Sequence, residues 1–193
     1  ARVKHGGFSS FTIRFTITDA RYSWDPPAPA WTVDKNASKV TFASSFDGGA
    51  FNGSFRRWDA VIRFDPANLA GSSVAATFDM ASAVTGEATR DQALVEPDWF
   101  SARAFPKATF TASSFKALGG GRYQAVGTLT IRGVTKPLTL PFSLVITGDT
   151  AKMTSNVGLN RLAFGVGQGD WKTTEVVPGT VTVNISLTAK RAK

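Results

Sequence analysis

The sequence predicts an all-β protein built as one eight-stranded antiparallel barrel, with a short helix in the 86–97 region. Two observations carry this prediction. Apolar and polar residues alternate with a period of two in about eight runs after Trp31, as expected for strands with one buried face. Gly, Pro and Asp residues separate these runs by short connections. A sheet of this size removes its unpaired edges most simply by closing on itself.

The clearest strand pair spans residues 127–142. Leu129 and Ile131 alternate with threonines, and Arg132-Gly133 then interrupts the run. Glycine adopts positive φ without a steric penalty, so a tight hairpin turn is expected there. The chain continues on alternating apolar residues, Val134, Leu138, Leu140 and Phe142. Pro137 has no N–H group, which predicts that the second strand is bent or at an edge near its start.

The remaining runs place the other strands. We expect them over residues 40–46, 51–64, 74–80, 109–113, 123–131, 138–144, 151–159 and 181–187. Within 51–64 the apolar positions change parity at Arg56-Arg57, which predicts a β-bulge. Several inward positions are small, which predicts open space along the barrel axis; they are Gly53, Ala60, Ala76, Ala125 and Gly127.

Residues 86–97 have helix-favouring composition instead of alternation. Thr89 is a candidate cap, and Pro97 is expected to end the helix. Three large rings follow at Trp99, Phe100 and Phe105. We therefore expect this segment to lie across one end of the barrel.

The first 30 residues form a head of undetermined role. Apolar residues alternate from Phe11 to Ile17, as in one strand, and residues 25–29 are proline-rich, as in a stiff linker. We accordingly divide the chain into a head at 1–30 and a barrel domain at 31–193.

Composition excludes several classes of chemistry. The chain has 193 residues, no Cys and a single His, His5, which lies in the head. Cysteine-ligated zinc, thiolate nucleophiles and a His-based metal site are therefore excluded, and we predict neither metal ligands nor catalytic residues. The nearest carboxylates, Asp91, Glu96 and Asp98, fit helix capping and solvation better than a hydrolase pair. The Gly-rich run at 165–169 lacks the Lys-Ser/Thr of a phosphate-binding loop.

The net charge of +8 leaves two readings open. One is a solvated basic surface, and the other is contact with an anionic partner such as a membrane surface. We expect no nucleic-acid binding, because the basic residues are scattered and form only the pairs Arg56-Arg57 and Lys190-Arg191.

The ordered motifs resemble the YceI-like family of bacterial polyisoprenoid-binding proteins. The residues that carry the resemblance are Trp31–Asp34 with Ser38 and Phe42, Gly53–Phe55 with Trp58, Arg90-Asp91 with Leu94, Asp98–Phe100, Phe105-Pro106 with Phe110 and Ser113, Leu129–Pro137, and Arg161 with Phe164-Gly165. They span roughly residues 31–189. One departure is Ala37, where the family often has His.

The resemblance implies a lipocalin-like barrel that binds, carries or stores an isoprenoid lipid, such as a ubiquinone tail or a polyprenyl phosphate, in the periplasm or outside the cell. The rings and aliphatic side chains on the inner strand faces would line the site: Phe42, Phe55, Trp58, Ile62, Phe78, Trp99, Phe100, Phe105, Phe110, Leu129, Ile131, Leu138, Phe142 and Phe164. From the residues alone, a solidly packed core and a lined tunnel are equal alternatives.

Three basic residues are candidates for contact with a polar headgroup: Arg90, Arg132 and Lys136. The alternative function is a non-catalytic partner module of a membrane redox protein, tethered through the proline-rich segment. A hydrolase that uses Asp91 or Asp98 is the weakest reading, since no His or Cys is placed to assist it. The sequence also leaves a homodimer open.

Overall fold

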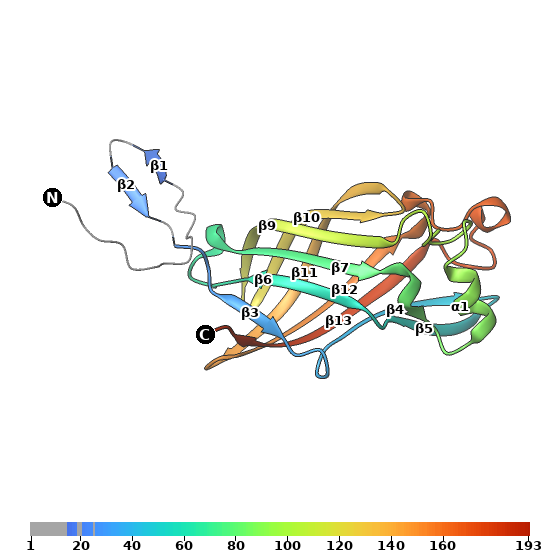
Figure 1. The fold of residues 1–193 in the computed structure, drawn as a ribbon, viewed down its shortest axis with the longest axis horizontal. Coiled ribbons are helices and arrows are strands. Elements are labelled where there is room, and N and C mark those ends of the chain that lie inside the picture. The colour runs from blue at the N-terminus through green and yellow to red at the C-terminus, as the bar shows by residue number, and fades with distance from the viewer. Residues whose placement is uncertain (1–14, 19–20, 25) are drawn as a thin grey trace, which may run out of the picture.

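The structure, a computed structural model, describes residues 15–18, 21–24 and 26–193 (Figure 1). Most of the chain forms one large antiparallel sheet rolled into a barrel. Its strands are β3 (Ala30–Val33), β4 (Lys39–Phe46), β5 (Gly49–Phe55), β6 (Trp58–Arg63), β7 (Ser73–Asp79), β8 (Ala83–Val84), β9 (Lys107–Gly119), β10 (Arg122–Ile131), β11 (Val134–Thr147), β12 (Thr150–Asn160) and β13 (Thr180–Arg191). The helices are α1 (Ala88–Leu94) and four 3-10 turns, η1 (Leu69–Gly71), η2 (Met80–Ser82), η3 (Arg161–Phe164) and η4 (Gly169–Lys172).

The barrel wall consists of eight strands in sequence order. Three of them are interrupted: β3 continues into β4, β5 into β6, and β7 into β8. β6 pairs with β3 and β7, while β5 pairs with β4 and β8, so each interrupted strand has the same neighbours along its length. β13 closes the wall by pairing with β12 on one side and with β3 and β4 on the other. The predicted fold class is therefore confirmed.

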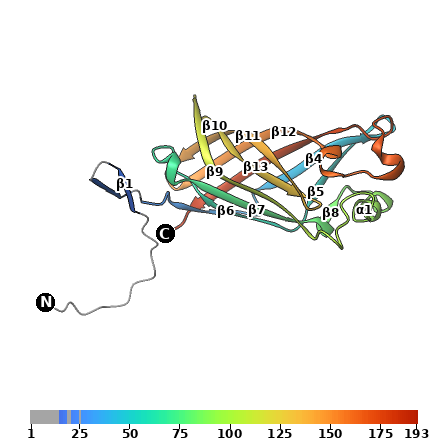
Figure 2. The same ribbon diagram turned by 90° about the horizontal axis from the view of Figure 1, so that it is seen from above.

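The two ends of the barrel differ (Figures 1 and 2). α1 and its neighbouring loops cover one end, and the C-terminus and the start of β3 lie at the other. We call these the lid end and the C-terminal end. At the lid end, residues 85–106 form the segment that we call the lid.

The irregularity expected at Arg56-Arg57 is a complete break between β5 and β6. Both backbone N–H groups turn away from the ladder, and that of Arg56 donates to the carbonyl of Ser82 while that of Arg57 donates to its hydroxyl. The interruption is larger than a bulge because Ser82 of η2, and not a neighbouring strand, accepts the hydrogen bonds of these two N–H groups.

β11 is an open edge on its β12 side over the first part of its length, as Pro137 predicted. Its pairing with β12 covers only residues 143–147, whereas its pairing with β10 runs from 134 to 143. Pro137 and Pro141 supply no N–H group to the unpaired stretch. The hydroxyl of Ser155 on β12 instead donates to the carbonyl of Pro141.

Two of the five small inward residues do not provide space along the axis. A Cβ at Gly53 would meet the ring of Phe42, which already occupies that position. A Cβ at Gly127 would lie 2.7 Å from the Cβ of Ala112 and closer still to the carbonyl of Thr111. Gly127 lies at a register shift between β9 and β10, so its role is close backbone approach. The three alanines do face open space.

We therefore expect Gly127→Ala to destabilise the barrel by about 1–3 kcal/mol, the cost of overpacking at a site that has no room. Gly158→Ala on β12 is the matched control, because the nearest atom to its added Cβ is the Thr180 Cγ2 at 3.3 Å. Urea unfolding of both variants measures the difference. Equal stability of the two variants would contradict the close-approach role.

The head contributes a separate two-stranded sheet, β1 (Phe15–Thr18) with β2 (Arg21–Trp24). The second strand was not predicted, and Phe11 and His5 lie outside the described residues. The end of the proline-rich segment is fixed to the barrel and is not a free linker. Ala28 is fully buried, its N–H donates to the carbonyl of Gly71, and the Asn68 amide donates to the carbonyl of Pro26.

The cap of α1 lies two residues before Thr89, the predicted cap. Glu87 is the cap, and its carboxylate accepts hydrogen bonds from the N–H groups of Thr89 and Arg90. These bonds lower the pKa of the Glu87 carboxyl below its usual value. Within the described part of the chain, no helix has the length and apolar character needed to span a bilayer.

Candidate functional site

The barrel interior holds two cavities with almost wholly apolar walls. The C-terminal cavity, of about 180 Å³, lies between the inner faces of all eight wall strands; among its lining residues are Trp31, Trp58, Ala76, Phe110, Ala125 and Phe142. The lid cavity, of about 160 Å³, lies beneath the lid and residues 161–181; among its lining residues are Phe42, Phe55, Leu94, Trp99, Phe100 and Phe164. The interior therefore contains unfilled apolar volume, which favours the lined tunnel over the solidly packed core.

Five side chains border both cavities, and we call them the waist: Val40, Phe78, Leu129, Leu159 and Val183. Phe78 extends a series of rings from one cavity to the other. Its centroid lies 6.4 Å from that of Trp58 in the C-terminal cavity and 5.6 Å from that of Phe55 in the lid cavity. A chain molecule that fills both cavities must pass these side chains.

Thirteen of the fourteen residues predicted to line a lipid site face a cavity. Trp58, Ile62, Phe110, Leu138 and Phe142 line the C-terminal cavity. Phe42, Phe55, Trp99, Phe100, Ile131 and Phe164 line the lid cavity, and Phe78 and Leu129 belong to the waist. Phe105 lies outside both, because its ring packs against Gly133 in the β10–β11 turn.

Four aromatic rings pack together at the C-terminal end of the interior. Phe64 has edge-to-face contacts with Phe115, Tyr123 and Phe142 at centroid distances of 5.4, 5.4 and 5.9 Å. Tyr123 and Phe142 stack at 5.5 Å. Such contacts stabilise, so these rings form one apolar cluster at this end of the interior.

The lid is held by hydrogen bonds that its backbone carbonyls accept from donors outside it. The guanidinium of Arg132, in the β10–β11 turn, donates to the carbonyls of Pro97 and Trp99. The N–H groups of Gly167 and Gln168 both donate to the carbonyl of Asp98 at 2.8 Å. The loops after α1 and after β12 are thus joined over the lid cavity.

Arg161 is the most unusual residue of the site. Its side chain is only 4% exposed, and its five N–H groups donate to the carbonyls of Pro178, Val166, Trp171, Thr173 and Val177 at 2.8–2.9 Å. No carboxylate lies within 4.0 Å of it among the described residues. Burial lowers the pKa of the guanidinium below its usual value. Its cation lies 5.5 Å from the Trp99 ring centre, which adds a cation–π contact.

The sequence indicated Arg161 through the family motif but did not indicate its role. A lone Arg before an apolar segment carries no signal of burial. The Gly-rich run that follows gives the better clue, since Gly165 and Gly167 have φ values of +70° and +98°. These conformations let residues 161–179 wrap around the guanidinium.

The predicted headgroup residues do not converge. Arg90 stacks on the Phe51 ring at 4.2 Å and bonds weakly to Thr85, Arg132 is engaged with the lid, and Lys136 is exposed on β11. Ser44 is among the residues that line the lid cavity, and its hydroxyl is buried away from the cavity surface with no hydrogen-bond partner among the described residues. Ser44 was not among the predicted residues.

The carboxylates near the lid have local structural roles. Asp91 accepts hydrogen bonds from the N–H and hydroxyl of Thr85 at 2.7 and 2.6 Å, which ties α1 to β8. Within the described ranges, no group of three or more His, Asp or Glu side chains is placed to hold a metal ion. The geometry therefore offers an apolar binding volume.

Comparisons with known proteins agree with this reading. The model of the YceI-like domain matches residues 31–189. The protein YceI of Salmonella arizonae is 37% identical over 146 residues, which is 74% of this chain and 73% of that protein. The protein YceI of Escherichia coli O157:H7 is 38% identical over 97 residues, and this match spans only half of either protein.

Solved structures show the same barrel. BcnA of Burkholderia cenocepacia superposes with a TM-score of 0.79 at 34% identity, over 82% of this chain and 99% of that one. A polyisoprenoid binding domain from Saccharophagus degradans has a TM-score of 0.68 at 17% identity, over 85% and 99% of the two chains, and shares the fold. The family match, the barrel and the hollow apolar interior lead to one conclusion: this chain belongs to the YceI-like family.

Proposed function

We propose that this protein binds an isoprenoid lipid of the ubiquinone or polyprenyl type inside the barrel, and carries or stores it without catalysing a reaction. The observation that carries the proposal is the pair of apolar cavities joined at the waist. Rings and aliphatic side chains form nearly all of their walls. A dry, hydrocarbon-lined volume binds by removing apolar ligand surface from water, and it gives little affinity to polar molecules. The name of the Saccharophagus domain is consistent with such a ligand.

The shape of the interior supports a slim ligand. An engineered cavity of about 150 Å³ in another protein holds one benzene molecule. Cavities of about 180 and 160 Å³ are each of that order, so each takes a short part of a chain. A longer isoprenoid occupies both cavities and the waist between them.

The lid cavity favours a neutral oxygen-bearing headgroup over a phosphate. All five N–H groups of Arg161 are already bonded, and the walls of this cavity are almost wholly apolar, with the one unpartnered hydroxyl, that of Ser44, buried behind them. A desolvated phosphate needs several donors, whereas a quinone carbonyl or an alcohol needs one. Of the two headgroups that the sequence leaves open, the quinone type is therefore our choice.

Organic extraction of the purified protein, followed by mass spectrometry, tests the proposal. We expect a long-chain isoprenoid in near-equimolar amount, and we expect delipidated protein to take up ubiquinone-10 in preference to undecaprenyl phosphate. Repeated extraction that yields no long-chain lipid, together with no uptake of either probe, would refute lipid binding. Stable capture of a membrane redox protein by lipid-free barrel would instead support the partner-module alternative.

The family resemblance also motivates a periplasmic or secreted location as part of this proposal. Fractionation of cells that express the natural gene measures it directly. Recovery of the protein in the cytosolic fraction would refute this part alone.

A further inference from the structure

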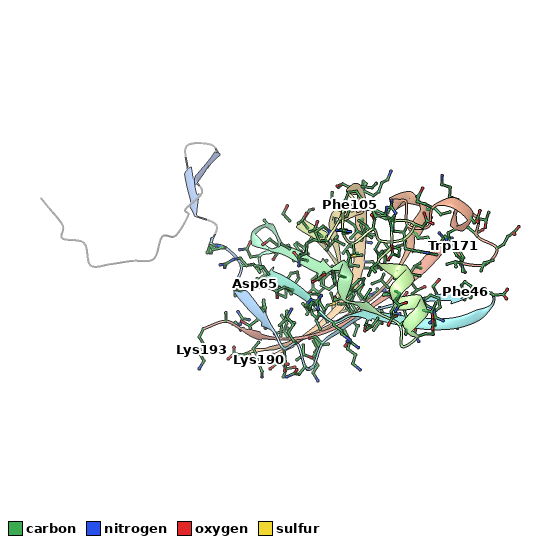
Figure 3. All side chains as sticks on the ribbon, turned by 45° about the vertical axis from the view of Figure 1, so that its right-hand side comes forward. Phe46, Asp65, Phe105, Trp171, Lys190 and Lys193 are labelled. Carbon is green, nitrogen blue, oxygen red and sulfur yellow. The ribbon has the colours of Figure 1, made fainter. Side chains whose placement is uncertain are left out.

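Charged side chains are distributed unevenly along the barrel axis. Seven basic side chains lie at the C-terminal end, on strand termini and on the loops that connect them. They are Arg63, Lys116, Arg122, Lys152, Lys190, Arg191 and Lys193. The same region carries two acidic side chains, Asp65 and Asp149. Figure 3 shows Asp65, Lys190 and Lys193 at this end, far from Phe46 and Trp171 at the other.

The lid end has no such excess of positive charge. The lid alone carries four acidic residues, Glu87, Asp91, Glu96 and Asp98, against Arg90 and Arg103. Much of the net positive charge of the described residues is therefore concentrated at the C-terminal end of the barrel. Such a concentration produces a directional field and is not a uniformly solvated basic surface.

The cations at the C-terminal end are exposed and largely uncompensated. Among the described residues, Arg191 is the one cation of this set within 4.0 Å of a carboxylate, at 3.8 Å from Asp149. Lys190 donates to the hydroxyl of Thr150, a neutral group. The hairpin between β9 and β10 carries Lys116 and Arg122, both exposed.

Exposed apolar side chains lie among these cations. Leu118, at the tip of the β9–β10 hairpin between Lys116 and Arg122, is 47% exposed. Val145 on β11 is 65% exposed and pairs across the ladder with Lys152. Nucleic acid is bound through charge with stacking rings or base contacts, whereas a bilayer surface accepts cations and aliphatic side chains together.

The C-terminal cavity lies directly behind this end. Trp31, near the start of β3, and Arg63 and Phe64, at the end of β6, line it. An isoprenoid that leaves the barrel through water loses about 0.8 kcal/mol for each exposed CH₂ group. Exchange at a bilayer avoids this cost, because the chain remains in contact with hydrocarbon.

We propose that the C-terminal end is a docking surface for an anionic phospholipid bilayer, and that lipid is exchanged through this end. The exchange step rests on the proposed function, whereas the docking of this end on a bilayer does not. The seven basic side chains of this end attract the anionic surface and orient the barrel on it, and Leu118 inserts at the bilayer interface. The lid end then faces away from the membrane.

The experiment is co-sedimentation of the full chain with sucrose-loaded vesicles, one set of phosphatidylcholine and one with 30% phosphatidylglycerol. We expect binding to the anionic vesicles only, with affinity that falls as salt rises. Each cation near an anionic surface contributes about fivefold to binding, so the double variant Lys116→Glu with Arg122→Glu is expected to bind at least about 25-fold more weakly. Leu118→Ser is expected to weaken binding without a change in net charge.

The control is the double variant Arg56→Glu with Arg103→Glu, which makes the same change in net charge at exposed residues away from the C-terminal end. It is expected to keep most of the vesicle binding. Equal loss in both double variants, binding to neutral vesicles, or insensitivity to Leu118→Ser would overturn the docking surface. Binding to DNA as tight as to anionic vesicles would overturn it as well.

Vesicle binding and lipid content are measured on the same preparations. If the barrel contains isoprenoid but does not bind anionic vesicles, the docking proposal fails and the proposed function stands. If it binds vesicles but never contains lipid, the proposed function fails, and the surface remains without the exchange step.

Discussion

Arg161→Met is expected to lower the free energy of unfolding by about 3–5 kcal/mol, the range measured when one partner of a buried charged network is removed. The guanidinium gathers five carbonyls from residues 166–178, and no neighbouring donor of the described chain replaces it. Each carbonyl left buried and unpaired costs roughly 1–3 kcal/mol, partly relieved where water enters. Domains have total stabilities of about 5–15 kcal/mol, so this is a large fraction.

Urea unfolding followed by tryptophan fluorescence measures the effect. Arg161→Lys is the informative second variant, because an ammonium group keeps the charge but offers only three donors to the five carbonyl acceptors. It is expected to recover part of the stability and not all of it. Arg56→Met, at an exposed position, is expected to stay within about 0.5 kcal/mol of the original chain. A loss below about 1 kcal/mol for Arg161→Met would show that the carbonyls do not depend on it.

Ala76→Trp is expected to reduce the co-purified isoprenoid at least tenfold. Ala76 on β7 faces the C-terminal cavity, and an indole there occupies the volume that the ligand needs. Ala75→Trp is the matched control, since Ala75 is the neighbouring residue on the same strand and points outward. It is expected to keep the full lipid content, measured by extraction and mass spectrometry.

Overpacking costs roughly 1–3 kcal/mol, so the fold of each variant is checked by circular dichroism before extraction. Ala60→Trp gives an independent test from the facing position, because Ala60 pairs with Ala76 and lines the same cavity. A folded Ala76→Trp protein with undiminished lipid would place the ligand elsewhere.

The fold was largely readable from the sequence because each wall strand has one apolar face. Of the fourteen residues predicted to line the site, thirteen face a cavity, and ten of these lie on strands, where period-two alternation assigns each residue to a face. Trp99, Phe100 and Phe164 lie outside the strands and were named from the family motifs. The break at Arg56-Arg57 was located but underestimated, because its size depends on η2, which lies 25 residues further along the chain. Local pattern does not contain that information.

The polar features of the site could not be read in the same way. Burial of Arg161 arises from a segment that folds around it, and five backbone carbonyls have no sequence signature. Ser44 looks like any serine in a strand. The role of Gly127 was misassigned because a missing side chain signals either open space or a close neighbour, and only the packing of Thr111 decides between them.

If a prenyl chain loads as proposed, its end passes the waist side chains, Phe78 and Leu129 among them, on the way from one cavity to the other. Displacement of those side chains adds an activation energy to loading that the equilibrium affinity does not contain. Short prenyl chains that stop before this constriction would equilibrate quickly, and long ones slowly and with a steep temperature dependence. Retention time, more than equilibrium preference, would then determine which lipids remain with the purified protein.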